Sequence, residues 1–157
     1  MSKKDQRFYF TKEGIEKLKE ELRQLVEEKR PALVKRVARA RDFGDLSENS
    51  EYSNAREELN ILDGRIEEIK EILKKAVVVK KASANSQTVK IGSQVTVTTD
   101  GQTLTFTVVG EWEADPAAKK ISHQSPLGKA LLNKKVGDKV EIEAPAGKIL
   151  YTIKKIE

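Results

Sequence analysis

One apolar repeat constrains this chain more than any other feature. Between residues 55 and 73, apolar side chains recur in steps of four and three, the heptad spacing of a coiled coil. Its members are Ala55, Leu59, Leu62, Ile66, Ile69 and Leu73. A similar stripe precedes it, at Ile15, Leu18, Leu22, Leu25, Leu33, Val37 and Ala40. Only residues 42–47 connect the two stripes, and a short connection makes neighbouring helices antiparallel. The sequence therefore predicts a helical hairpin.

The first helix of this hairpin has a start signal and an interruption. Thr11 is typical of an N-cap, and Glu13 and Glu16 follow in the first turns, where the helix dipole favours acids. Pro31 costs a helix interior about 3 kcal/mol, so a kink or short break is expected there. At about 1.5 Å per residue, residues 15–44 would form an arm roughly 45 Å long. On the repeat alone, a hairpin that merely mediates dimerisation remains an open alternative.

The composition changes near Lys80. Residues 81–87 are small and polar, as in a linker, and β-branched residues dominate beyond them. Ser125 and Pro126 form a typical helix start before residues 127–132. Strands are predicted at residues 76–80, 94–99, 103–109, 139–143 and 148–155. The predicted fold class is α + α+β: an N-terminal antiparallel coiled-coil hairpin domain, residues 1–80, and a domain of residues 81–157 in which a small curved antiparallel sheet covers one helix.

The composition excludes several kinds of site. There is no cysteine, which rules out disulfides and thiolate metal sites, and the only histidine is His123. No apolar run approaches the roughly 20 residues that span a bilayer, and the first residues lack the apolar stretch of a signal peptide. A cytoplasmic protein without a membrane partner is therefore expected. The net charge of +5 mildly favours a polyanionic partner.

Acidic residues gather where the two predicted helices meet. Asp42, Asp45, Glu48 and Glu51 recur at every third position. The basic residues before them have no acid interleaved and form a basic shaft: Lys29, Arg30, Lys35, Arg36, Arg39 and Arg41. Asp45 and Glu48 fit a variant capping box that would simply start the second helix. They also fit a site for Mg²⁺, which prefers oxygen ligands.

Two carboxylates at an exposed tip cannot form a complete active site, because the tip has no suitable base, substrate pocket or surrounding shell of ligands. They could complete the site of a partner, by sharing a metal with the partner's carboxylates and a nucleic-acid phosphate. The basic shaft could then contact phosphates of the bound strand.

The tip closely resembles the signature of a known family, the bacterial transcript cleavage factors of the GreA/GreB family. Residues 40–52 carry this likeness, with Thr11-Lys12-Glu13-Gly14 at the first helix start. The second half resembles the family's C-terminal domain, and Glu113-Ala114-Asp115-Pro116 has the form of the GreA branch. The other matching stretches are residues 108–110, 121–122, 125–132 and 136–138.

This resemblance implies a function. The family's hairpin enters the secondary channel of bacterial RNA polymerase, and Asp45 and Glu48 match its essential acidic pair. They would help to hold a second Mg²⁺ and its water, so that the polymerase cuts the nascent RNA of a backtracked complex. The protein would be a monomeric accessory factor rather than an enzyme.

The resemblance also implies contact residues. Arg36, Arg39, Arg41 and Tyr52 would contact RNA or polymerase. The C-terminal domain, FKBP-like in this family, would dock outside the channel through Gln124, Ser125 and Pro126. An ordinary helix cap is the alternative for Ser125 and Pro126.

Three other functions remain open at this point. One is a relative that docks in the same channel without stimulating cleavage. Another is an FKBP-like prolyl isomerase or chaperone, which would need an aromatic-lined pocket from Phe106, Trp112 and Tyr151. The third is an RNA-gripping arm like those that bind tRNA, although such an arm should stay basic to its end.

Overall fold

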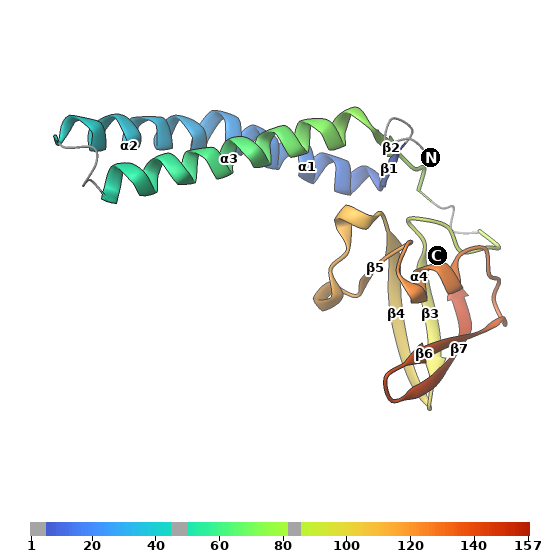
Figure 1. Cartoon of the computed structure of the whole chain (residues 1–157). Helices are drawn as coiled ribbons and strands as arrows, with labels where there is room; N and C mark the ends of the chain where they lie inside the picture. The colour runs from blue at the N-terminus through green and yellow to red at the C-terminus, as the bar shows by residue number, and fades with distance from the viewer. Residues whose placement is uncertain (1–5, 45–49, 82–85) are drawn as a thin grey trace. The chain divides into compact units, whose positions relative to one another are not determined.

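The computed structural model describes residues 6–44, 50–81 and 86–157 (Figure 1). The chain divides into two compact units: Glu16–Lys75, and Met1–Ile15 together with Ala76–Glu157. We call the first unit the arm and the second the sheet unit. By this division, the short segments on either side of the arm group with the C-terminal half. The expected boundary between residues 80 and 81 stays a prediction.

The arm is the antiparallel helical hairpin that the apolar repeat predicts. Its helical segments are α1 (Lys12–Gln24), η2 (Leu25–Lys29), α2 (Arg30–Asp42) and α3 (Ser50–Lys74), and α2 and α3 lie side by side (Figure 1). Buried side chains of the arm lie on both stripes: Leu18, Leu25, Val37, Ala40, Ala55, Ile66 and Ile69. Near the end of α3, Ile72 is buried and the expected Leu73 is only half-buried.

The expected break at Pro31 takes the form of a π-helical turn rather than a gap. In η2 an amide bonds to the carbonyl five residues earlier, rather than four as in an α-helix. The Arg30 amide, for example, donates to the Leu25 carbonyl. Pro31 has no N–H, and in an α-helix its ring would clash with the carbonyl four residues earlier. The π turn ends just before Pro31, which then lies in the first turn of α2, where a proline is tolerated. The first helix therefore continues past Pro31.

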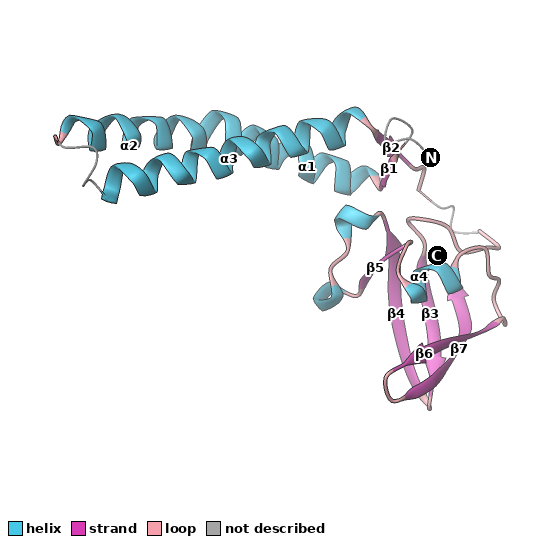
Figure 2. Cartoon of the chain, in the orientation of Figure 1, coloured by secondary structure: helices cyan, strands magenta, loops and turns pink. Residues whose placement is uncertain are grey.

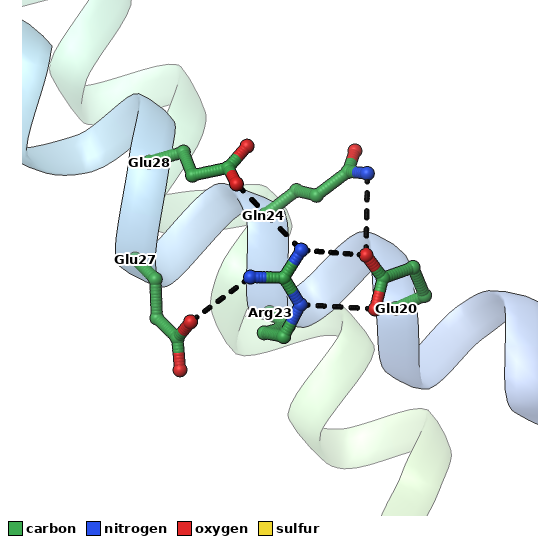
Figure 3. A network of polar contacts seen from close by, with 5 residues as sticks. All are labelled: Glu20, Arg23, Gln24, Glu27 and Glu28. Atoms are coloured by element: carbon green, nitrogen blue, oxygen red, sulfur yellow. Dashed lines mark hydrogen bonds and ion pairs between the residues drawn. The ribbon is translucent and has the colours of Figure 1, made fainter.

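A surface network connects α1 to this π turn (Figure 3). The Arg23 guanidinium donates to Glu20 at 2.7 and 2.9 Å and to Glu27 at 3.0 Å, and Glu28 lies 3.6 Å away. Hydrogen bonding to Glu20 is the main cause that raises the pKa of Arg23. All these groups are exposed, and exposed ion pairs add little to the free energy of folding. Their role is local: one guanidinium spans the change of helix type.

A two-stranded parallel pair joins the two ends of the arm. Strand β1 (Phe8–Phe10) precedes the arm and β2 (Ala76–Val78) follows it, with Tyr9 opposite Val77. Parallel neighbours need a crossover connection, and here the whole arm is that connection. The strand predicted at residues 76–80 contains β2, whereas β1 is only three residues long and has no strand pattern that predicts it.

The larger sheet has five strands in the order β5-β4-β3-β7-β6 (Figure 2). Their bounds are Gln94–Thr99 for β3, Gln102–Val109 for β4, Lys120–Ser122 for β5, Lys139–Ala144 for β6 and Gly147–Ile156 for β7. The expectation of a wholly antiparallel sheet is wrong at one edge, because β5 pairs with β4 in parallel. The reason is the connection: η3 (Glu111–Glu113) and η4 (Pro116–Ala118) carry the chain back along β4 before β5 begins.

One α-helix packs on this sheet, as predicted. Helix α4 (Pro126–Leu131) places Leu131 in the core, where it is fully buried. Val95 and Val97 of β3, Val108 of β4 and Ile153 of β7 belong to the same cluster. The β-branched composition of the second half thus supplies the sheet side of the core.

Two sequence motifs that are 102 residues apart meet at the start of α1. The Thr11 hydroxyl accepts from the Gly14 amide at 3.1 Å, which confirms Thr11 as the N-cap. The Glu113 carboxylate accepts from the Thr11 amide at 2.8 Å, from the Thr11 hydroxyl, and from the Gly110 amide at 3.3 Å. A side chain at position 14 would collide with Glu113. Glu113 therefore binds the N-cap residue Thr11 and leaves no room for a side chain at position 14.

Gly110→Ala should destabilise the sheet unit. A Cβ at position 110 would run into the backbone carbonyl of Tyr9, and backbone cannot give way as a side chain can. Overpacking of this kind costs about 1–3 kcal/mol, so thermal unfolding should begin at a lower temperature. Gly64→Ala is the control, because a Cβ there meets nothing within 4 Å and alanine favours a helix by about 0.5–1 kcal/mol. An unchanged unfolding temperature for Gly110→Ala would contradict the close approach.

Candidate functional site

The acidic tip lies between α2 and α3 in the sequence. Within the described residues, the first helix ends at Asp42 and α3 runs from Ser50. Asp45 and Glu48 lie outside the described residues, so both their cap and their metal roles stay predictions. Phe43, which directly follows the end of α2, is 86% exposed. Within the part of the chain that the structure describes, no three acidic or histidine side chains form a metal-binding cluster.

Arg36 and Glu51 form an ion pair next to the tip. The Arg36 Nε donates to Glu51 Oε1 at 2.6 Å, and its Nη1 donates to Glu58 Oε2 at 2.8 Å. Arg36 belongs to α2, and both carboxylates belong to α3. The hydrogen bond from Arg36 lowers the pKa of the Glu51 carboxyl and so favours its ionised form. Sequence reasoning missed this pair, because the two partners are on different helices.

The shaft is less basic than the sequence of α2 predicts. Arg30 donates to both oxygens of Asp63, at 2.7 and 3.3 Å, and this hydrogen bonding lowers the pKa of Asp63. The Arg36 guanidinium is paired with Glu51 and Glu58. Acids of α3 thus neutralise part of the charge that α2 presents, and the pattern of either helix alone does not predict this.

Arg39, Arg41 and Tyr52 occupy the stretch of the shaft nearest the tip. Arg39 is exposed and forms no ion pair with a residue in the described ranges. The Arg41 guanidinium carbon lies 5.9 Å from the centre of the Tyr52 ring, within the range of a cation–π contact. The structure therefore brings Arg41 of α2 and Tyr52 of α3 together.

The expected docking residues surround the start of α4. The Ser125 hydroxyl accepts from the Gly128 amide at 3.0 Å and donates to the Ser122 carbonyl at 2.7 Å, so it caps the helix. Gln124 and Pro126 are exposed beside it. The cap is confirmed, and the docking role stays a prediction.

The aromatic residues that a prolyl isomerase would need belong to two different ring pairs. Phe106 packs against Tyr151 at 6.4 Å between ring centres, whereas Trp112 packs against Phe8 at 5.7 Å. A cavity of about 420 Å³ in the sheet unit has other walls. They are Tyr9, Val79, Ser86, Ile91 and three lysines, Lys80, Lys81 and Lys90.

No helix in the described ranges is both long enough and apolar enough to cross a membrane.

Comparisons with known proteins cover nearly the whole chain. Residues 8–78 match the model of the transcription elongation factor N-terminal domain, and residues 84–157 match that of the GreA/GreB C-terminal domain. The chain is 45% identical to transcription elongation factor GreA of Bacillus licheniformis, over 95% of this chain and 96% of that protein. It is also 45% identical to GreA of Oenococcus oeni, over 86% and 85%. A crystal structure of GreA factor homolog 1 of Thermus thermophilus is 29% identical, with a TM-score of 0.45 over 97% of this chain and 99% of that one. Both halves and the full-length relatives agree, and the chain belongs to the GreA/GreB family of transcription elongation factors.

Proposed function

We propose that this elongation factor inserts its arm into the secondary channel of bacterial RNA polymerase and stimulates cleavage of the nascent RNA in backtracked complexes. The observation that carries the proposal is the intact tip signature, residues 40–52, at the turn of a helical hairpin in a chain that matches both family domains. The polymerase performs the cleavage in the cytoplasm, and this monomeric factor is an accessory to it. Gln124 and Pro126 contact the rim of the channel.

Asp45 and Glu48 are the proposed metal ligands. Carboxylate oxygens suit Mg²⁺, which usually takes one or two protein carboxylates and fills its other positions with water or phosphate oxygens. Two carboxylates bind it weakly, so the free protein holds no tight ion and the polymerase supplies further ligands. Asp45 and Glu48 would hold this ion and its water for attack on the RNA, while a metal of the polymerase would stabilise the leaving oxygen.

The other residues of the arm have supporting roles. Arg39 and Arg41 contact phosphates of the extruded RNA, and Tyr52 orients Arg41 through their ring contact. The coiled coil holds the tip at a fixed distance along the arm. At about 1.5 Å per residue, the 25 residues of α3 alone extend roughly 37 Å.

The direct test adds the purified protein to a stalled, backtracked bacterial elongation complex. The expected result is release of short RNA fragments that carry the 3′ end, at a rate well above that of polymerase alone. A protein that binds polymerase but leaves the transcript intact would assign it to the non-cleaving relatives instead.

Neutralising the end of the shaft should weaken RNA contact in a salt-dependent way. The double variant Arg39→Gln/Arg41→Gln removes two proposed phosphate contacts. Each contact to a single strand contributes about 0.7 to the log–log salt slope, so the slope of RNA crosslinking should fall by about 1.4. A matched variant, Lys17→Gln/Lys19→Gln on the exposed part of α1, should keep the wild-type slope. Equal slopes for all three proteins would rule out the phosphate contacts.

A further inference from the structure

Arg36 holds the first turn of α3 against α2. Its two hydrogen bonds use different edges of the guanidinium, Nε at 2.6 Å from Glu51 and Nη1 at 2.8 Å from Glu58. Glu51 is the second residue of α3, and Glu58 lies two turns further along the same helix. Glu58 therefore fixes the plane of the guanidinium while the Nε edge faces Glu51. This arrangement, Arg36 with Glu51 and Glu58, we call the clasp.

The clasp restrains residues close to the proposed metal ligands. Glu51 follows Glu48 by three residues, and three residues of extended chain reach at most about 10 Å. On the other side, α2 carries Arg36 on the same rigid helix that ends at Asp42. Fixing the start of α3 to α2 therefore limits how far the two ends of the tip segment can separate.

We propose that Arg36 is a positioning residue for cleavage: with Glu51 it clamps the start of α3 and so fixes the anchor from which Glu48 reaches the metal. This role deepens the function proposed above and rests on it. It gives Arg36 a different task from Arg39 and Arg41, because its guanidinium is occupied by two carboxylates of the arm itself. It also takes Glu51 out of the set of tip acids that are available to a metal.

The effect is on placement rather than on the stability of the fold. The side chains are exposed, 38% for Arg36 and 56% for Glu51, so solvent screens the pair and folding gains little from it. Catalytic geometry is far more sensitive, since a displacement of about 1 Å can cost about 100-fold in rate. A weak restraint beside the tip can thus matter to cleavage while unfolding temperatures stay nearly unchanged.

A double-mutant cycle tests the clasp. Arg36→Gln and Glu51→Gln should each lower the maximal rate of stimulated RNA cleavage about tenfold, and the double variant should be no slower than the slower single variant. Competition binding should show that the affinity for polymerase is unchanged. Arg36→Lys should recover part of the rate, because lysine keeps the charge but not the two-edged fork.

The chain contains a matched control. Arg30 and Asp63 form another exposed Arg–carboxylate pair between α2 and α3, so Asp63→Asn removes the same kind of contact at another point of the arm. This variant should cleave within about twofold of the wild-type rate. If it slows cleavage as much as the clasp variants do, general loosening of the hairpin is the cause and the proposal is wrong.

The outcomes separate the clasp from its alternatives. If Arg36→Gln slows cleavage but Glu51→Gln does not, Arg36 acts on RNA or polymerase directly. If the two losses multiply in the double variant, the residues act independently. Either result overturns the proposal.

Hydrogen exchange on the free protein gives a second readout. The amides of residues 54–57 bond to the first-turn carbonyls of α3. Their exchange should accelerate in Arg36→Gln, and unchanged exchange would refute the clasp. A wild-type protein without stimulated cleavage would overturn the proposed function, whereas this measurement would still decide whether Arg36 holds the start of α3.

Discussion

Asp45→Asn and Glu48→Gln should each reduce stimulated RNA cleavage about 100-fold or more, the scale on which a single group that stabilises a transition state acts. An amide keeps the shape of the carboxylate but is a much weaker ligand for Mg²⁺. The loss should be greatest when Mg²⁺ is limiting. Fragment release from a backtracked complex measures the rate, and competition for polymerase checks that binding is nearly intact.

Two further variants control for the chemical change alone. Asp63→Asn and Glu67→Gln make the same replacements on α3, where both side chains are exposed and form ion pairs within the arm. They should cleave like wild type. If the tip amides also cleave like wild type at limiting Mg²⁺, the shared-metal mechanism fails and the two acids serve only to cap α3.

Shortening the arm by one heptad should abolish stimulated cleavage while leaving polymerase docking intact. Residues 16–22 of the first helix and residues 64–70 of α3 are suitable, because Glu21 and Arg65 are hydrogen-bonded across them at 3.0 and 3.1 Å. Deleting both heptads keeps the apolar stripes in register. Seven residues at about 1.5 Å each withdraw the tip by roughly 10 Å, far beyond the ~0.5 Å tolerance of a catalytic constellation.

This deletion distinguishes the proposed function from its rivals. A hairpin that only mediated dimerisation would tolerate the loss of one heptad, and so would a prolyl isomerase. Circular dichroism should show that the shortened protein is still helical. A folded, shortened protein that retains full cleavage activity would mean that the tip is not delivered through a channel.

The sequence alone determined the elements whose signals are local. The heptad steps predicted both sides of the hairpin, because burying one face of a helix requires apolar residues at its own period. Alternating β-branched runs predicted β3 at both ends and β4, β6 and β7 to within one residue. Thr11 and Ser125 were predictable as caps, since each bonds to an amide three residues further on. The candidate tip acids likewise came from one continuous motif.

Only the tertiary structure decided which distant segments meet. The parallel pairing of β1 with β2, and of β4 with β5, depends on how the chain crosses over. Neither β1 nor β5 has a sequence pattern that predicts it. Glu113 reaches Thr11 from far along the chain, and Glu51 and Glu58 reach Arg36 from the opposite helix. The periodicity of one helix specifies which face it buries, but the charges on its exposed face find partners only once the second helix is packed beside it. In the folded arm, some arginines of the basic shaft therefore form ion pairs with acids of α3.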